Sequence, residues 1–216
     1  MTAAPDRAPR PALLAAARAL DALGFMPSKS GNLSCRTPAG FLITPAGLPY
    51  ALTTEDDLVE VALDGSVLGN GRPSSEWRLH QAVYAARAEA MAVVHTHSPF
   101  ATALSCARQG LPPFHYMIAL AGGADIRCSG YATFGTAELA ALAVQALEGR
   151  KAALLANHGV VALGSGIAAA QALAMEVENL ARQYLALRAA GLQPVLLTQA
   201  ELEGVFAQFG GYGRLG

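Results

Sequence analysis

Two short apolar runs that each lead into histidine constrain this chain more than any other feature. Residues 91–97 read Met-Ala-Val-Val-His-Thr-His, and the apolar residues 152–156 are followed by Asn157, His158 and Gly159. Short apolar runs of this kind are typical of buried strands. Because alternate residues of a strand project from the same face, His95 and His97 can reach one ion. We therefore expect two buried strands that deliver histidine at their ends.

His158 is the third candidate ligand for such an ion. A catalytic zinc usually takes three protein ligands and keeps one position for water or substrate, and His95, His97 and His158 would meet that requirement. A pair of histidines one residue apart is a weak signal by itself, and a single histidine is more often a core or surface residue than a ligand. These residues alone leave a metal site and a structural role both open.

Composition excludes several classes of partner. The chain of 216 residues fits one domain with a sizeable core, and its formal net charge of -1 provides no basic field for nucleic acid or acidic membranes. An anionic ligand must therefore be held by local geometry. No apolar run is long enough for a transmembrane helix, and the N-terminus lacks the charged-then-apolar order of a signal peptide.

The cysteines and lysines add two further expectations. Three widely spaced cysteines do not predict a disulfide framework, and a reduced, cytoplasmic protein is expected. Lysine occurs only at Lys29 and Lys151, so Schiff-base chemistry has just two candidate amines. Any carbonyl chemistry is therefore more readily assigned to a metal.

The pattern along the chain predicts one α/β domain. Residues 1–10 are rich in proline and alanine and are expected to form a disordered tail, with a single domain over residues 11–216. Apolar spacing predicts helices over residues 11–23 and 167–190, and a strand over residues 125–128. A capped helical turn is expected after Thr53, and Thr198 and Glu201 form a capping-box pattern for a last helix.

The segment Pro73-Ser74-Ser75-Glu76-Trp77 has two interpretations. Serine is a preferred N-cap and an acidic residue in the first turn suits the helix dipole, so the segment can simply begin a helix that extends to about residue 88. Alternatively, two serine hydroxyls and free amides at a helix N-terminus form a phosphate site. Local sequence favours the first interpretation.

Several separated stretches together resemble the class II (zinc-dependent) aldolase/epimerase family, and most closely its L-fuculose-1-phosphate aldolase branch. The resemblance covers essentially the whole chain after the first ten or so residues, and the order and spacing of its motifs are specific. The matching stretches are residues 30–34 (Ser-Gly-Asn-Leu-Ser), 42–45 (Leu-Ile-Thr-Pro), 73–78 (Pro-Ser-Ser-Glu-Trp-Arg), 94–97 (Val-His-Thr-His), 115–119 (His-Tyr-Met-Ile-Ala), 131–135 (Tyr-Ala-Thr-Phe-Gly), 157–159 (Asn-His-Gly) and 212–213 (Tyr-Gly).

The resemblance implies a fold and a metal centre. The fold is a three-layer α/β arrangement in which helices cover a largely antiparallel central sheet. One zinc ion per subunit would be bound by His95, His97 and His158, with Glu76 as a fourth ligand in the resting state and as the acid/base during catalysis. Tyr116 would transfer a proton at the aldehyde oxygen, and Tyr212 is implied as a further catalytic residue.

The resemblance also implies how the substrate is bound. Phosphate would be bound by Asn32, Gly47, Ser74 and Ser75. Phe134 would line the aldehyde pocket, and Phe209 lies with Tyr212 in a mobile C-terminal tail that closes over a neighbouring subunit's site. One residue departs from the family pattern: Ala46 stands where the family often has threonine or serine, so one hydroxyl donor to phosphate is missing. Loss of one hydrogen bond to a charged group costs about 1.5–3 kcal/mol.

The implied function is reversible cleavage of a phosphorylated ketose, L-fuculose 1-phosphate or a close relative, into dihydroxyacetone phosphate and a short, lactaldehyde-like aldehyde through an enediolate. The implied assembly is a homotetramer with active sites at subunit interfaces. Alternatives with the same fold are a sugar-phosphate 4-epimerase, a methylthioribulose-phosphate dehydratase and a sugar-acid phosphate decarboxylase. A more remote alternative is a non-catalytic, adducin-like binding protein, although such relatives usually lack the metal ligands that this chain retains.

Overall fold

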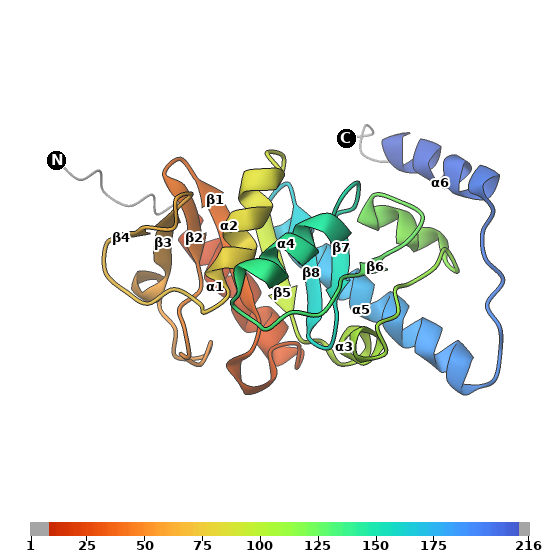
Figure 1. The fold of residues 1–216 in the computed structure, drawn as a ribbon, viewed down its shortest axis with the longest axis horizontal. Helices are drawn as coiled ribbons and strands as arrows, with labels where there is room; N and C mark the ends of the chain where they lie inside the picture. Colours follow the sequence, from red (N-terminus) through yellow and green to blue (C-terminus); the bar gives the residue numbers. More distant parts are fainter. Residues whose placement is uncertain (1–8, 212–216) are drawn as a thin grey trace.

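A computed structural model describes residues 9–211 of the chain, in which eight strands form one sheet (Figure 1). The strand order is β4-β3-β2-β1-β5-β8-β7-β6, and neighbouring strands are antiparallel except for β6 and β7. The strands are β1 (Asn32–Thr37), β2 (Gly40–Ile43), β3 (Val59–Ala62), β4 (Val67–Leu68), β5 (Ala92–Thr96), β6 (Arg127–Cys128), β7 (Ala152–Leu155) and β8 (Gly159–Gly164).

Helices cover both faces of this sheet. The α-helices are α1 (Arg10–Ala22), α2 (Trp77–Ala86), α3 (Pro99–Cys106), α4 (Ala137–Ala146), α5 (Ile167–Ala189) and α6 (Gln199–Gly211). Three short 3-10 turns are η1 (Pro27–Lys29), η2 (Glu55–Asp57) and η3 (Tyr116–Ala121). Helices α1, α3 and α5 pack on one face, α2 and α4 pack on the other, and α6 packs against η3. The predicted three-layer, largely antiparallel α/β fold is confirmed.

The alternation of side chains along the central strands produces two cores. Leu33 and Val94 are fully buried in the core beneath α1, α3 and α5, whereas Val93 and Val161 are buried in the core beneath α2 and α4. Strands β5 and β7 are buried along their whole length, as apolar runs without a polar face predict. Among the described residues, no helix is long and apolar enough to cross a membrane.

Several boundaries differ from those predicted. Helix α1 begins at Arg10, one residue before the expected start of the domain, because the Arg10 guanidinium is buried and donates to the carbonyl oxygens of Glu55 and Leu58. Strand β6 contains only two of the four expected residues. The cap of η2 is Thr54 rather than Thr53, and Asp57 completes its capping box.

Helix α2 also differs from its predicted limits. Its first residue is Trp77 and its last is Ala86, so the helix is shorter than expected at both ends. Glu76 occupies the N-cap position without capping the helix through its side chain, and its backbone amide donates to Ser74 Oγ at 3.3 Å. The expectation of a serine N-cap with Glu76 in the first turn is therefore wrong, and the Glu76 carboxylate is left available for other contacts.

Candidate metal and active site

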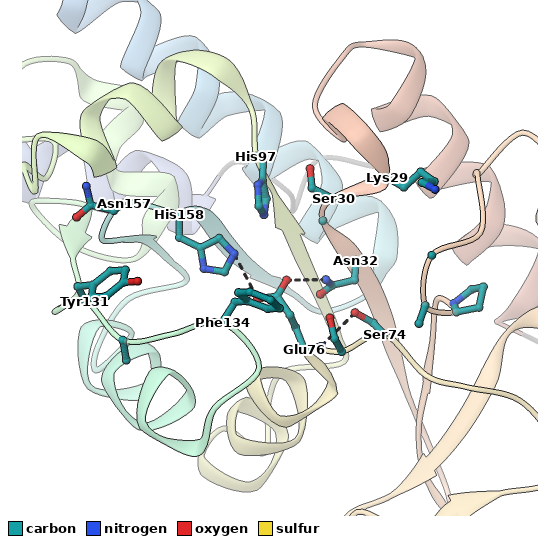
Figure 2. A pocket seen from close by; sticks show the side chains of 16 residues that line it. Lys29, Ser30, Asn32, Ser74, Glu76, His97, Tyr131, Phe134, Asn157 and His158 are labelled. Carbon is teal, nitrogen blue, oxygen red and sulfur yellow. Dashed lines mark hydrogen bonds and ion pairs between the residues drawn. The ribbon is translucent and has the colours of Figure 1, made fainter.

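Four side chains from separate segments converge at the carboxyl end of β5. They are Glu76 before α2, His95 in β5, His97 directly after β5, and His158 in the turn between β7 and β8. One ligand atom from each residue lies within 4.8 Å of the other three, so the group could hold a metal ion. Figure 2 shows His97, His158 and Glu76 around the centre of a cleft.

The sheet topology brings the histidines together. Strands β5 and β8 are antiparallel with Thr96 opposite Val160, so the end of β5 lies beside the beginning of β8. His97 and His158 flank this junction, and their ring centroids are 4.8 Å apart. The His95 and His97 rings are 4.9 Å apart, as expected for alternate residues on one face of a strand.

The turn that carries His158 is anchored to the end of α3. Asn157 has a φ of 55°, a left-handed conformation that asparagine tolerates better than most residues. The backbone amide of Asn157 donates to the Ser105 carbonyl oxygen at 2.9 Å, and that of His158 donates to Ser105 Oγ at 3.2 Å. The local sequence thus holds the third histidine in place through the backbone.

The hydrogen bonding of His95 prepares its second nitrogen for a cation. His95 is fully buried, and its Nδ1 lies 2.9 Å from the Val160 carbonyl oxygen, which can only accept. In the neutral ring the proton is therefore on Nδ1 and the lone pair on Nε2. That Nε2 lies 3.0 Å from His97 Nε2 and 3.2 Å from Glu76 Oε2. Acceptors this close repel one another unless a proton or a metal ion lies among them.

Glu76 provides a second indication that these residues fit a metal. The side chain is 6% exposed, and its Oε1 accepts no well-formed hydrogen bond from any described residue, although His158 Nε2 lies 3.3 Å away. A buried carboxylate oxygen without a donor is costly, and a cation within reach would compensate for it. Three histidine nitrogens and one carboxylate are also the donors that zinc prefers. The donor set and the unpaired oxygen therefore fit the metal that the sequence implies.

The pKa values follow from burial and from the close packing of these groups. Burial first, and then the charge at His95, lowers the pKa of His97 to about 3 and that of His158 to about 4. Burial would also lower the pKa of His95, but Glu76 raises it overall. Burial would raise the pKa of Glu76, but His95, His158 and Asn32 hold it well below its ordinary value. The result is a neutral His97 and His158 beside an ionised carboxylate, as metal binding requires.

A buried chain of hydrogen bonds leads away from Glu76, which we call the Glu76–Tyr84 chain. Asn32 Nδ2 donates to Glu76 Oε2 at 3.0 Å, so Asn32 Oδ1 faces His80 and must accept from its Nε2 at 2.6 Å. With its proton on Nε2, neutral His80 accepts at Nδ1 from Ser34 Oγ at 2.6 Å, and Ser34 Oγ accepts from the Tyr84 hydroxyl at 2.8 Å.

Each member of the Glu76–Tyr84 chain has a consistent donor or acceptor role, provided that His80 is neutral. Burial lowers the pKa of His80 to about 3, which keeps the ring neutral at ordinary pH. Asn32, Ser34, His80 and Tyr84 are all buried, so water cannot replace a lost partner. The chain therefore holds the Asn32 amide with its N–H toward Glu76.

The cleft around the four residues has a volume of about 370 Å³ and contains most of the predicted substrate-binding residues. Asn32, Gly47, Ser74, Ser75 and Phe134 all line it. The side chain of Asn32 is already engaged by Glu76 and His80, which leaves one amide hydrogen for a ligand. The other lining residues are Lys29, Ser30, Gly31, Pro45, Ala46, Glu76, His97, Tyr131, Ala132, Asn157 and His158.

Two predicted residues do not line this cleft, and a third lies beyond the part of the chain that the structure describes. Tyr116 is 52% exposed at the start of η3, where its ring stacks on His115 with centroids 4.8 Å apart. Phe209 in α6 lies 6.5 Å from the Tyr116 ring, and neither residue lines the cleft. Tyr212 lies outside the described residues.

Two features of the site are not predicted from the sequence. One is the link from Asn32 through His80 and Ser34 to Tyr84, although Asn32 and Ser34 lie two residues apart on a strand and His80 and Tyr84 lie four apart on a helix. Those spacings place each pair on one face and were the available signal. The other is Lys29 at the rim of the cleft, for which the sequence contains no local pattern.

Comparison with known proteins identifies the family. The family model described as "Class II Aldolase and Adducin N-terminal domain" matches residues 11–185. The chain belongs to this family. It is 49% identical over 205 residues to the 5-methylthioribulose-1-phosphate/5-deoxyribulose-1-phosphate aldolase of Rhodospirillum rubrum, covering 94% of this chain and 92% of that protein.

Two further relatives support the assignment to the class II aldolases. The L-fuculose phosphate aldolase of Escherichia coli strain K12 is 44% identical over 191 residues, which cover 88% of this chain and 89% of that protein. A solved structure of L-fuculose 1-phosphate aldolase superposes with a TM-score of 0.90 at 37% identity, covering 97% of this chain and 98% of the other. The chain is therefore an enzyme of the aldehyde-lyase class, and its His/Glu cluster agrees with the metal dependence of class II aldolases.

Proposed function

We propose that this chain is a zinc-dependent aldolase that reversibly cleaves a ketose 1-phosphate into dihydroxyacetone phosphate and a short aldehyde. The observation that carries the proposal is the buried Glu76 carboxylate, which lies 3.2 and 3.3 Å from the Nε2 atoms of His95 and His158 in a cleft that His97 also lines. The named relatives in Rhodospirillum rubrum and Escherichia coli are aldolases that act on phosphorylated sugars. Their names support this substrate class.

Two ketose phosphates are the candidate substrates. L-Fuculose 1-phosphate is supported by the Escherichia coli relative, and a 5-methylthio- or 5-deoxyribulose 1-phosphate is supported by the Rhodospirillum rubrum relative. In Figure 2, Tyr131 lies on the His158 side of the cleft, opposite Lys29, and Phe134 lies near its centre. Both rings are more than half exposed and offer an apolar surface for the end of the aldehyde. This surface suits the methyl or methylthio end that these substrates share.

The chain's own residues account for the proton transfers of cleavage. A bound zinc ion would supply Lewis acidity that stabilises negative charge developing on the ketose oxygens. A base takes the proton of the C4 hydroxyl while the C3–C4 bond breaks, leaving the aldehyde and an electron pair that is delocalised over C3 and the C2 carbonyl. Glu76 takes up a proton from solvent and delivers it to C3, which completes dihydroxyacetone phosphate. In synthesis Glu76 removes the same proton.

The base at the C4 hydroxyl is proposed to be Tyr116 of a neighbouring copy. Tyr116 and Phe209 lie together but do not line the cleft of their own chain. A homotetramer with active sites at its interfaces would bring them to another copy's site, with Tyr212 following in the sequence. We also propose a cytoplasmic location, which is consistent with the three cysteines being free thiols.

The test is release of dihydroxyacetone phosphate from a panel of ketose 1-phosphates, with and without a chelator and with zinc added back. We expect L-fuculose 1-phosphate or a 5-substituted ribulose 1-phosphate to be cleaved, and chelation to abolish cleavage reversibly. Glu76→Gln should retain the fold and lose at least a hundredfold in kcat. Zinc binding without cleavage of any member would refute the aldolase assignment and favour the epimerase, dehydratase or decarboxylase alternatives. Absence of both zinc and activity would favour an adducin-like binding protein.

A further inference from the structure

The cleft has two chemically different ends. In Figure 2, Lys29, Ser30, Asn32 and Ser74 lie on one side, whereas Tyr131, Asn157 and His158 lie on the other. The first side is completed by the loop that contains Ala46 and Gly47 and by Ser75. Among the described residues that line the cleft, Lys29 is the one lysine or arginine.

Three segments that are distant in sequence form this polar end. Residues 44–46 and 72–74 run side by side, because Ala46 N donates to the Arg72 carbonyl oxygen at 3.0 Å and Ser74 N donates to the Thr44 carbonyl oxygen at 3.1 Å. The segment with Lys29 is fastened from the other side by the Tyr50 hydroxyl, which donates to the Gly31 carbonyl oxygen at 2.8 Å. The polar end is therefore held by backbone contacts on each segment.

The backbone at Lys29 is held in an uncommon conformation. Ser28 and Lys29 have φ values of 57° and 65°, a left-handed region that costs ordinary residues energy and is often retained at functional sites. The turn is closed by Lys29 N and Ser30 N, which donate to the carbonyl oxygens of Met26 and Pro27. Within the described part of the chain, no carboxylate forms a salt bridge with the Lys29 ammonium. The charge is thus available to a ligand.

The neutral donors at this end do not balance a phosphate dianion. Ala46 has no hydroxyl, and its backbone amide already donates to the Arg72 carbonyl oxygen. Among the described residues, the backbone amides of Gly47 and Ser75 donate to no backbone carbonyl oxygen, so they can donate to a ligand. The hydroxyl groups of Ser74 and Ser75 can donate as well. A metal ion held by Glu76 and the histidines would lie at the centre of the cleft, whereas Lys29 is the one charged residue among the described residues at the polar end. A cation beside a phosphate strengthens its binding, and Lys29 lines this end of the cleft.

We propose that Lys29 is the phosphate-binding cation of this site and that its ammonium takes the place of the hydroxyl missing at Ala46. The inference rests on the proposed function for the identity of the substrate, but not for the binding of phosphate itself. Lys29 contributes to affinity for the dianionic end of the substrate and takes no part in bond cleavage. Its removal therefore weakens binding and leaves the chemical step intact.

The chain offers a matched control, because its other lysine, Lys151, lies directly before β7 and does not line the cleft. In the zinc-loaded enzyme, Lys29→Met should raise KM for the ketose phosphate and the inhibition constant for inorganic phosphate by about 10–100-fold, or about 1.4–2.7 kcal/mol. Its kcat should stay within about threefold. Lys29→Arg should bind phosphate nearly as well as the wild type, and Lys151→Met should be unchanged. Adding Ala46→Ser to Lys29→Met should recover part of the lost affinity.

A second measurement separates this inference from the proposed function. The rise in the thermal midpoint caused by inorganic phosphate reports binding without turnover, and it should be large in the wild type and small in Lys29→Met. If the wild type cleaves no ketose phosphate but shows this Lys29-dependent rise, the proposed function fails and the phosphate site stands. If Lys29→Met binds phosphate as tightly as the wild type, or loses kcat with KM unchanged, the assignment of Lys29 is overturned.

Discussion

Replacing His80 by leucine tests whether the Glu76–Tyr84 chain holds the Glu76 carboxylate in place for the proposed metal site. His80 is completely buried and links Asn32 Oδ1 to Ser34 Oγ, with both distances at 2.6 Å. Leucine fills a similar volume but bonds to neither atom. The Asn32 amide is then free to turn its oxygen toward Glu76, which would replace a donor to the carboxylate with an acceptor. We expect both the stability and the metal affinity to fall.

The magnitudes follow from the partners that are left unpaired. A buried polar group without its hydrogen bond costs about 1–3 kcal/mol, so Asn32 Oδ1 and Ser34 Oγ together would lose about 2–6 kcal/mol. For a chain of this size, that corresponds to a thermal midpoint lower by about 4–24 °C. Groups that orient metal ligands typically contribute a factor of about 10–100 to metal affinity, and we expect a loss of zinc affinity in that range.

Tyr84→Phe is the matched control, because it removes the last hydroxyl of the Glu76–Tyr84 chain and leaves the contacts of Asn32 in place. Loss of that one hydrogen bond should cost about 0.5–1.5 kcal/mol and leave zinc affinity within about threefold of the wild type. The assays are thermal unfolding of the metal-free proteins and zinc titration against a chromophoric chelator. If His80→Leu bound zinc like the wild type and were no less stable than Tyr84→Phe, the proposed positioning role of the Glu76–Tyr84 chain would be refuted.

Two further substitutions test how the segments beside the metal ligands are held. A methyl group at Gly159 would overlap the Thr96 carbonyl oxygen. Gly159→Ala should therefore lower the free energy of unfolding by about 1–3 kcal/mol and weaken zinc binding. An unchanged thermal midpoint would contradict the close approach of β8 to β5. The buried Glu178 carboxylate accepts from the amides of Phe100 and Ala101 at 2.9 and 2.8 Å, in the first turn of α3, which begins two residues after His97. Glu178→Gln should lower the free energy of unfolding in urea by about 1.5–3 kcal/mol, and a change below about 0.5 kcal/mol would show that the charge at Glu178 is not required.

The convergence of the three histidines could be predicted because each depends on a short-range pattern. His95 and His97 follow the two-residue period of a strand, and His158 follows an apolar run of strand length. The resemblance to a family supplied the pairing of these segments. The boundaries were less predictable, since Arg10 and Glu76 take their positions from tertiary contacts: Arg10 binds two distant carbonyl groups, and Glu76 turns from the helix end toward the histidines.

The Glu76–Tyr84 chain shows what the local patterns lack. Asn32 and Ser34 share one face of β1, and His80 and Tyr84 share one face of α2, as the sequence alone indicates. What joins the two faces is the packing of α2 onto the sheet, and no local rule specifies that packing. The roles proposed for Tyr116 and Phe209 present a similar difficulty on a larger scale, because a site shared between copies cannot be located from the contacts of one chain.

The net charge of -1 connects the composition to the proposed role of Lys29. With no long-range positive field, attraction of a phosphorylated sugar has to arise within the cleft, from the metal ion that Glu76 and the histidines would hold and from a cation at the polar end. Alanine at position 46 removes one neutral donor, which increases the need for a local cation. Sequence periodicity cannot reveal that cation, because the turn that carries Lys29 has left-handed backbone at Ser28 and Lys29. Neither serine nor lysine has a strong preference for this conformation. Charge balance within the cleft is therefore the physical argument that connects Lys29 with the substrate's phosphate.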